Sequence, residues 1–209
     1  MKGSPLTKVA RVVAHLATHP RHVVPYLTTG PKSARSPLEL GLPWFSQAAI
    51  EFLETFVTRR MTLFEYGSGG STVFFARRAA TVISTEDNEQ WLARVRTAVA
   101  KEKLTNVQLQ HRPFDFHRTA EFERSSYLNS LPAEPLDIIV VDGTEEESVV
   151  RPRCFALAET RIKTGGIIIV DDSWRYPELR ARNHARSWRE FRSTGPCRPG
   201  VTSTDIFFY

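Results

Sequence analysis

The chain has 209 residues, of which 41% are hydrophobic and 24% are charged, a composition ordinary for one globular α/β domain. No apolar run approaches the roughly 18 residues of a membrane-spanning helix, and the first residues lack the apolar core of a secretory signal. The two cysteines, Cys154 and Cys197, do not suggest a disulfide framework. We therefore expect a cytoplasmic protein without a transmembrane segment.

The net charge of +5 is concentrated at the start of the chain. Six of the 28 basic residues lie before position 38 without any acidic residue, which leaves 22 basic against 23 acidic residues afterwards. Apolar residues recur at helical spacing up to Leu16, and His19 and Pro20 end the pattern. We expect residues 1–42 to form a basic helical arm and linker. The arm either packs on the domain as an extra helix or makes a peripheral contact with acidic lipid or a polyanion.

Residues 43–209 alternate between predicted helices and strands. Such alternation is typical of a parallel sheet that is covered by helices on both faces. In chain order, we predict a helix at 44–58, a strand at 62–66, a helix to about 79, a strand at 81–85, a helix from 88 to about 103, a strand at 106–110, a strand within 136–143, a helix at about 148–162, a strand within 163–172, a helix at 182–191 and a final strand at 202–208.

The first of these strands runs directly into a glycine-rich turn. Glycine permits the backbone angles of such a turn and lets a ligand lie against the main chain. Gly67 and Gly69 fit the dinucleotide fingerprint G-x-G-x-x-G, but its third position is Thr72, which counts against NAD or FAD. Glu65 precedes the turn and would repel phosphates. A cationic ligand without phosphate, such as S-adenosylmethionine, suits this turn better.

Residues 65–72, Glu-Tyr-Gly-Ser-Gly-Gly-Ser-Thr, resemble motif I of the Rossmann-like (class I) S-adenosylmethionine-dependent methyltransferases. Three further landmarks of that family follow in order, at 81–86, 136–143 and 163–172. Residues 195–208 resemble the last hairpin of a bacterial subgroup that is linked to the tailoring of glycans or small molecules.

The resemblance covers residues 43–209 and implies their fold and function. The fold would be a doubly wound, Rossmann-like α/β domain with helices on both faces. Its mostly parallel, seven-stranded sheet would have the order 3-2-1-4-5-7-6, with the last strand antiparallel. Residues 43–209 would then be the domain that binds S-adenosylmethionine and transfers its methyl group.

The resemblance also implies roles for individual residues at the cofactor. Glu65 would face the ammonium group through water, and Glu86 would accept hydrogen bonds from the two ribose hydroxyls. Ser71 and Thr72 either donate to the cofactor carboxylate or cap the following helix. Phe114 either covers the adenine ring or belongs to the core, and Glu86 could instead be a solvated acid. The expected cofactor-binding residues are Glu65, Gly67, Ser68, Gly69, Ser71, Thr72, Glu86, Phe114 and Asp142.

Three aspartates end strands beside the expected methyl donor. Asp142, Asp171 and Asp172 would repel one another unless a positive group joined them, and their oxygen ligands suit Mg²⁺ or Mn²⁺. The pattern is similar to the catechol-type O-methyltransferases, in which a metal orients the acceptor hydroxyl. Those enzymes carry a lysine where this chain has Glu145. A metal-free route with Asp142 or His184 as the base therefore stays open, and we expect Asp142 and Asp172 to be catalytic.

The sequence favours a hydroxyl on a small molecule or sugar as the methyl acceptor. The near-neutral charge outside the arm does not favour nucleic acid, and the (D/N)-P-P-(Y/F) motif of many N-methyltransferases is absent. Two alternatives stay open: an inactive, methyltransferase-like binding module, and an enzyme that acts on RNA or protein. A homodimer is compatible with the sequence. The candidate acceptor contacts are Trp44, Tyr127, Trp174, Arg175 and Tyr176.

Overall fold

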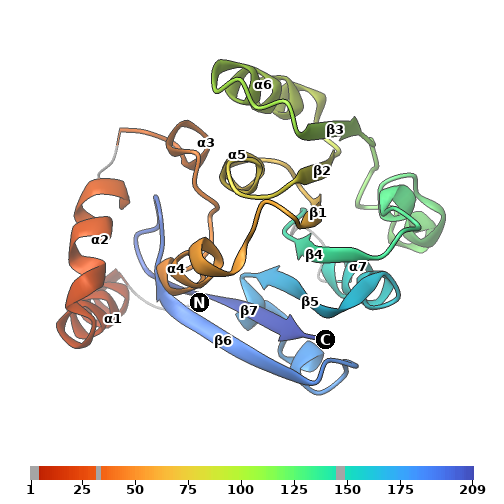
Figure 1. The fold of residues 1–209 in the computed structure, drawn as a ribbon. Coiled ribbons are helices and arrows are strands. Elements are labelled where there is room, and N and C mark those ends of the chain that lie inside the picture. Colours follow the sequence, from red (N-terminus) through yellow and green to blue (C-terminus); the bar gives the residue numbers. More distant parts are fainter. Residues whose placement is uncertain (1–4, 32–33, 145–148) are drawn as a thin grey trace.

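The computed structural model of the chain describes residues 5–31, 34–144 and 149–209. It contains a seven-stranded sheet in the order β3-β2-β1-β4-β5-β7-β6 (Figure 1). Strands β1 to β5 pair in parallel, and β7 runs antiparallel to both β5 and β6. The predicted fold class and strand order are confirmed. The strands are β1 (Thr62–Tyr66), β2 (Thr81–Glu86), β3 (Val107–His111), β4 (Leu136–Val141), β5 (Ile162–Asp171), β6 (Ser187–Thr194) and β7 (Val201–Phe208).

Helices cover both faces of this sheet. On one face, α4 and α5 pack against the central strands, and α6 lies beside α5; α7 covers the other face together with short 3₁₀ turns (Figure 1). The α-helices are α1 (Pro5–Thr18), α2 (Val23–Thr29), α3 (Pro37–Leu40), α4 (Gln47–Phe56), α5 (Gly70–Ala76), α6 (Glu89–Lys101) and α7 (Val150–Glu159). The 3₁₀ turns are η1 (Pro20–His22), η2 (Thr119–Arg124), η3 (Leu128–Ser130), η4 (Ser173–Arg175) and η5 (Pro177–Arg180).

Strand β4 shows why the central strands are apolar throughout. Ile138 and Val140 pack into the core under α4 and α5, whereas Ile139 and Val141 pack into the core under α7. Successive side chains of a strand point to opposite faces, so both sets are buried. The carboxyl ends of the parallel strands consequently meet at one edge, where the functional residues follow.

The predicted helix at 182–191 is wrong. Residues 187–194 form β6, an edge strand that pairs antiparallel with β7 along its whole length. Trp188, Arg189 and Glu190 are exposed, whereas Phe191 is buried against the core under α4. Because an edge strand shows much of its surface to water, its charged residues mask the alternation that identifies a strand.

The N-terminal arm packs on the sheet domain. The predicted helix lies within α1, whose Val12 is buried and which contacts β6 and β7; α2 was not predicted. The backbone N–H of Cys197 donates to the carbonyl of Thr29 over 2.7 Å. His22 Nε2 lies 3.1 Å from Glu51 Oε1 of α4. The arm is thus attached to both α4 and the β6–β7 turn.

The segment predicted as a linker contains the short helix α3. Ser36 caps it in a reciprocal arrangement with Glu39, and Leu38 is buried in a cluster with residues of α5 and α6. The proposed division at residue 42 therefore crosses a segment that is packed against the domain, and it stays a prediction.

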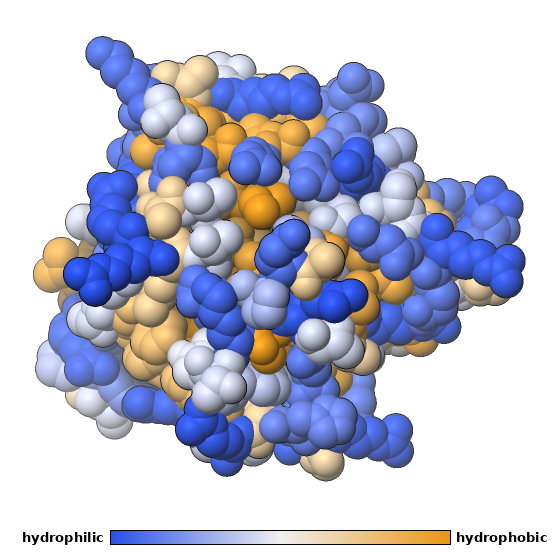
Figure 2. All heavy atoms as spheres, turned by 45° about the vertical axis from the view of Figure 1, so that its right-hand side comes forward, coloured by the Kyte–Doolittle hydropathy of each residue, from blue (hydrophilic) through white to orange (hydrophobic). Residues whose placement is uncertain are grey.

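The molecular surface is mainly polar. Figure 2 shows a face on which hydrophilic residues surround smaller apolar areas. Among the described residues, no helix combines the length and the hydropathy needed to cross a membrane. The outer side of the arm is an exception to this polarity, with five large apolar residues exposed: Leu6, Val9, Val13, Val24 and Leu27.

Candidate active site

A cleft of about 810 Å³ lies at the carboxyl ends of the parallel strands. One wall is the glycine turn between β1 and α5, together with Glu86 at the end of β2. Asp142 after β4 and Asp172 after β5 lie on the same cleft. Topological switch points at this edge are the usual ligand sites of open α/β sheets. Other parts of the lining come from Ser36–Leu38, Trp44, Trp91, Arg94, Arg151, Arg175 and Arg198.

The glycine turn is held in a geometry that other residues would disturb. Gly67 has a φ of +86°, and a Cβ there would lie 2.6 Å from the carbonyl oxygen of Asp142. A Cβ on Gly70 would lie 2.1 Å from the carbonyl oxygen of Leu42. A Cβ on Gly69 would come no closer than 3.9 Å to its nearest neighbour, Trp91. Gly67 and Gly70 therefore permit close packing, whereas Gly69 leaves backbone open to the cleft.

Glu86 is fixed at the end of β2. Its Oε2 accepts hydrogen bonds from the backbone N–H and the hydroxyl of Ser68, over 3.0 and 2.9 Å. Its Oε1 accepts from the backbone N–H of Asn88 over 3.1 Å, and the residue is only 6% exposed. This carboxylate lines the cleft in one defined orientation. That arrangement is more consistent with the predicted contact to ribose than with the alternative, in which Glu86 is a solvated acid.

Glu65 lies beneath the turn and is buried. Its Oε1 accepts a hydrogen bond from the hydroxyl of Thr72, which itself accepts from the backbone N–H of Gly69 over 2.9 Å. Burial raises the pKa of Glu65 to about 7, although the hydrogen bond from Thr72 lowers it. Its Oε2 has no hydrogen-bond partner among the described residues. A buried acceptor without a partner fits the predicted role of binding, through water, the ammonium group of the cofactor.

Phe114, predicted either to cover the adenine ring or to belong to the core, packs against the core, and Trp91, which was not among the predicted residues, lines the cleft. Phe114 packs against Phe116 and Phe122, with ring centroids 5.4 Å apart in both pairs, and is not among the cleft residues. Trp91 of α6 lines the cleft instead, and its Nε1 donates to the carbonyl of Ser68 over 2.7 Å. Trp91 is therefore better placed than Phe114 to cover a flat ring beside Glu86.

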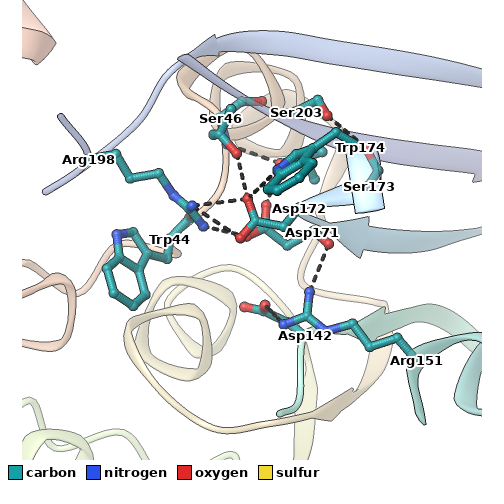
Figure 3. A network of polar contacts seen from close by, with 12 residues as sticks. Trp44, Ser46, Asp142, Arg151, Asp171, Asp172, Ser173, Trp174, Arg198 and Ser203 are labelled. Carbon is teal, nitrogen blue, oxygen red and sulfur yellow. Dashed lines mark hydrogen bonds and ion pairs between the residues drawn. The ribbon is translucent and has the colours of Figure 1, made fainter. Parts of the chain in front are cut away.

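Asp171 and Asp172 both bind Arg198 from the β6–β7 turn (Figure 3). The Arg198 Nη2 donates to Asp171 over 2.8 Å, and its Nη1 donates to Asp172 over 3.0 Å. Thr204 donates to Asp171 over 2.8 Å and Thr202 donates to Asp172 over 2.7 Å. Both carboxylates are thus held by one guanidinium group and two hydroxyl groups.

Asp142 lies beside a second guanidinium group (Figure 3). Arg151 Nη2 is 3.2 Å from Asp142 Oδ1, and Arg151 also donates to the carbonyl oxygens of Gly143 and Asp171. The Arg151 side chain is 4% exposed, whereas that of Asp142 is 21% exposed. Arg151 therefore fixes the end of β4 next to the end of β5 and leaves part of the Asp142 carboxylate facing the cleft.

The pKa values of Asp171 and Asp172 shift in opposite directions. Burial, reinforced by repulsion from Asp142, raises the pKa of Asp171 well above its usual value despite the attraction of Arg198. Burial also raises the pKa of Asp172, but Arg198 and the hydrogen bonds from Thr202 and Trp174 outweigh it, so the net shift is downward. Asp172 consequently stays ionised and is a poor proton acceptor.

Comparison with known families settles the class. A family described as "Methyltransferase domain" matches residues 64–173, which is more than half of the chain. The chain belongs to this family. The prediction of a Rossmann-like, S-adenosylmethionine-dependent methyltransferase is confirmed. The search of curated proteins found no match.

Solved structures share the fold of this methyltransferase at low sequence identity. An O-methyltransferase from Bacillus cereus, in complex with SAH, is 18% identical, covers 93% of this chain and 98% of its own, and has a TM-score of 0.62. An rRNA methylase from Streptococcus thermophilus is 13% identical, with 84% and 99% covered and a TM-score of 0.55. A precorrin-6y C5,15-methyltransferase from Geobacter metallireducens is 14% identical, with 77% and 87% covered and a TM-score of 0.57. These names cover different acceptors, so the fold does not select one.

The predicted Mg²⁺ or Mn²⁺ does not fit the acidic cluster of this methyltransferase. Asp142, Asp171 and Asp172 converge as expected, but Arg151 and Arg198 already supply the positive charge that joins them. A divalent cation would have to displace Arg198 and lie beside a second guanidinium group, which like charge opposes. Within residues 5–31, 34–144 and 149–209, no group of three or more His, Cys, Asp or Glu could hold a metal ion. Glu145 lies outside these described residues.

The candidate acceptor contacts separate into cleft and core residues. Trp44 and Arg175 line the cleft, whereas Tyr127 and Tyr176 are buried. Trp174 stands beside Asp172, to which its Nε1 donates over 3.2 Å. His184 pairs with Glu159, next to the start of β5 and so at the opposite edge of the sheet. This position removes His184 as a candidate base.

Sequence reasoning missed Arg151, Arg198 and Trp91. Arg198 lies in a turn rich in glycine and proline, where the sequence contains no pattern that pairs it with aspartates at the end of β5. Arg151 and Trp91 stand at helix starts, where a basic or aromatic residue is ordinary. The one available signal was the aspartate cluster itself, because buried acids require positive partners.

Proposed function

We propose that this methyltransferase transfers the methyl group of S-adenosylmethionine to a hydroxyl oxygen of a small molecule or sugar, with Asp142 as proton acceptor. The observation that carries the proposal is the single cleft that joins the glycine turn and Glu86 to the part-exposed carboxylate of Asp142. The SAH-bound O-methyltransferase from Bacillus cereus, which shares the fold, supports the choice of cofactor and reaction.

The proposed cofactor contacts follow from the turn and the end of β2. Glu86 accepts hydrogen bonds from the two ribose hydroxyls. Its carboxylate oxygens are held in place by the backbone N–H groups of Ser68 and Asn88. The open backbone at Gly69 admits the methionine portion, and the unpartnered oxygen of Glu65 lies beneath it. When a cationic ligand binds above Glu65, the pKa of this acid should fall, because an opposite charge favours its ionised form.

The proposed reaction is an in-line displacement. The bond between the cofactor sulfur and its methyl carbon breaks while the acceptor oxygen bonds to that carbon. The hydroxyl proton passes to Asp142, and SAH is the leaving group. Arg198 holds Asp172 and Asp171 in place, so these residues shape the acceptor side rather than take the proton. Positioning supplies much of the rate in such a reaction.

The test is methyl transfer from S-adenosylmethionine to a panel of hydroxylated metabolites and sugars, read as SAH released and product mass. Asp142→Asn should lower kcat by about 10²-fold or more while SAH affinity is retained; Asp115→Asn, a matched change outside the cleft, should be neutral. EDTA should leave the rate unchanged. Full activity of Asp142→Asn would refute the role of Asp142. Binding of SAH without turnover of any acceptor would favour the inactive binding module.

A further inference from the structure

A second hollow of about 190 Å³ adjoins the cleft and is rich in basic residues. Lys8 and Arg11 of α1, Arg175 of η4, and Arg198 contribute to its lining, together with Asp172 and Trp174. Asp172, Arg175 and Arg198 also line the main cleft, so the two spaces meet at these three residues. We call this space the basic hollow.

The charge of the basic hollow is uncompensated on the side of the arm. Lys8 and Arg11 have no carboxylate within ion-pair distance among the residues that the structure describes. The acid in the lining, Asp172, already binds Arg198 and accepts a hydrogen bond from Thr202. Two cations therefore face a hollow in which the negative charge is already neutralised, and an anion placed there would gain charge-assisted hydrogen bonds.

The position of α1 makes this arrangement part of the fold. Val12, adjacent to Arg11, is buried, and α1 contacts both β6 and β7. The arm is further fixed by the Cys197–Thr29 hydrogen bond in the turn that carries Arg198. Lys8 and Arg11 are thus presented to the basic hollow by a packed helix rather than by a free tail.

We infer that the methyl acceptor is an anion, and that its carboxylate or phosphate group binds in the basic hollow while its hydroxyl lies beside Asp142. This inference rests on the proposed function, because it assigns a substrate class to the same site. The hollow has room for one such group with a few waters, since a water occupies about 30 Å³ in the liquid. Lysine and arginine are the side chains that bind phosphate and carboxylate most directly.

The first test is calorimetric titration of inorganic phosphate into the SAH-saturated protein. The double variant K8Q/R11Q should bind phosphate at least about tenfold more weakly, because it loses two charged donors. The matched double variant R59Q/R60Q removes two exposed arginines before β1 and should bind phosphate as the wild type does. Both variants should bind SAH with unchanged affinity, which also shows that they are folded.

The second test compares matched acceptors on the SAH-bound protein: glucose 6-phosphate with glucose, and 4-hydroxybenzoate with 4-hydroxybenzyl alcohol. We expect tighter binding of the anionic member of at least one pair, and loss of that advantage in K8Q/R11Q. Equal binding within both pairs, phosphate binding that K8Q/R11Q leaves unchanged, or no phosphate binding would overturn the inference. Binding to vesicles of anionic lipid without phosphate binding would assign the arm to a membrane surface instead.

These measurements distinguish a failure of the proposed function from a failure of the inference on the basic hollow. If SAH does not bind, the proposed function fails together with the inference. If SAH binds but phosphate and the anionic acceptors do not, only the inference on the basic hollow fails.

Discussion

Glu65 and Glu86 lie on either side of the glycine turn and differ in their surroundings. Glu86 has hydrogen-bond donors on both carboxylate oxygens and lines the cleft, whereas Glu65 is buried with one oxygen unpartnered. Burial without enough hydrogen-bond donors favours the protonated form of a carboxylate, and it raises the pKa of Glu65. The two acids are consequently suited to different parts of one cofactor.

Glu86→Ala should weaken SAH binding by about 1–3 kcal/mol, since the ribose hydroxyls would lose their acceptor and the Ser68 hydroxyl would lose its hydrogen bond to Glu86. Calorimetric titration of SAH measures this loss. Glu134→Ala, which removes an exposed acid before β4, serves as the matched control. Equal SAH affinity in wild type and Glu86→Ala would remove Glu86 from the cofactor site.

Glu65 should make the ligand-free protein less stable as pH rises. Its pKa is about 7 in the folded state against 4.5 ordinarily, so the folded protein holds the proton more tightly than the unfolded chain. The free energy of unfolding should therefore fall between those two pH values by about 3 kcal/mol and change little above them. Urea unfolding at about pH 5 and about pH 8 measures the change.

Glu65→Gln should remove that part of the pH dependence, because glutamine keeps an acceptor for Thr72 without a titrating proton. Glu134→Gln should behave as the wild type. If Glu65→Gln lost as much stability as the wild type between the two pH values, the buried acid would not be the titrating group.

Among the secondary-structure elements, the β1–α5 and β6–β7 turns bring the functional residues to the ends of β4 and β5. The β1–α5 turn approaches the end of β4 so closely that Gly67 meets the Asp142 carbonyl. The β6–β7 turn brings Arg198 to Asp171 and Asp172 at the end of β5. The site is therefore assembled from turns that belong to distant parts of the chain.

Gly67→Ala should destabilise the protein more than Gly165→Ala. Both glycines have positive φ, +86° and +84°, so each alanine incurs backbone strain of about 1 kcal/mol. Only at Gly67 does the new methyl group also clash, since nothing lies within 4 Å of a Cβ on Gly165. Thermal unfolding and SAH titration compare the two. Similar stability and similar SAH affinity would show that the turn tolerates a side chain.

Arg198→Met should lower the free energy of unfolding by about 3 kcal/mol, because it leaves two buried carboxylates without their cation. Urea unfolding measures the loss, and Arg96→Met on exposed α6 is the control. Adding Asp172→Asn should recover part of the stability, because Asp172 is the acid that stays ionised and would lose its cation. A loss below about 1 kcal/mol would mean that the pair behaves as a surface salt bridge.

Periodicity predicts the buried strands and the mostly exposed helix α1, but not the edge strand β6. The apolar runs of β1, β4 and β5 and the Asn88 cap of α6 follow from local sequence, and the structure has all of them. The edge strand β6 was mistaken for a helix because its pairing with β7 is set by tertiary contacts. In the site, the strand-end acids could be found from the sequence, but Arg198 could not, since it is joined to them only through the fold.

At the scale of the whole molecule, the uneven charge has a structural meaning. The basic arm lies against the β6–β7 hairpin and presents Lys8 and Arg11 beside the cleft of an otherwise near-neutral domain. The cations of the basic hollow attract anionic ligands, and this attraction weakens as ionic strength rises. We therefore expect Lys8 and Arg11 of the arm to favour anionic acceptors at the site.

The most direct measurement is calorimetric titration of the purified protein with S-adenosylhomocysteine, with NAD as the comparison. We predict a dissociation constant on the order of micromolar for S-adenosylhomocysteine and no detectable binding of NAD, because Glu65 and Thr72 disfavour a pyrophosphate at the turn. Absence of S-adenosylhomocysteine binding, or binding of NAD in its place, would contradict the assignment of the cleft.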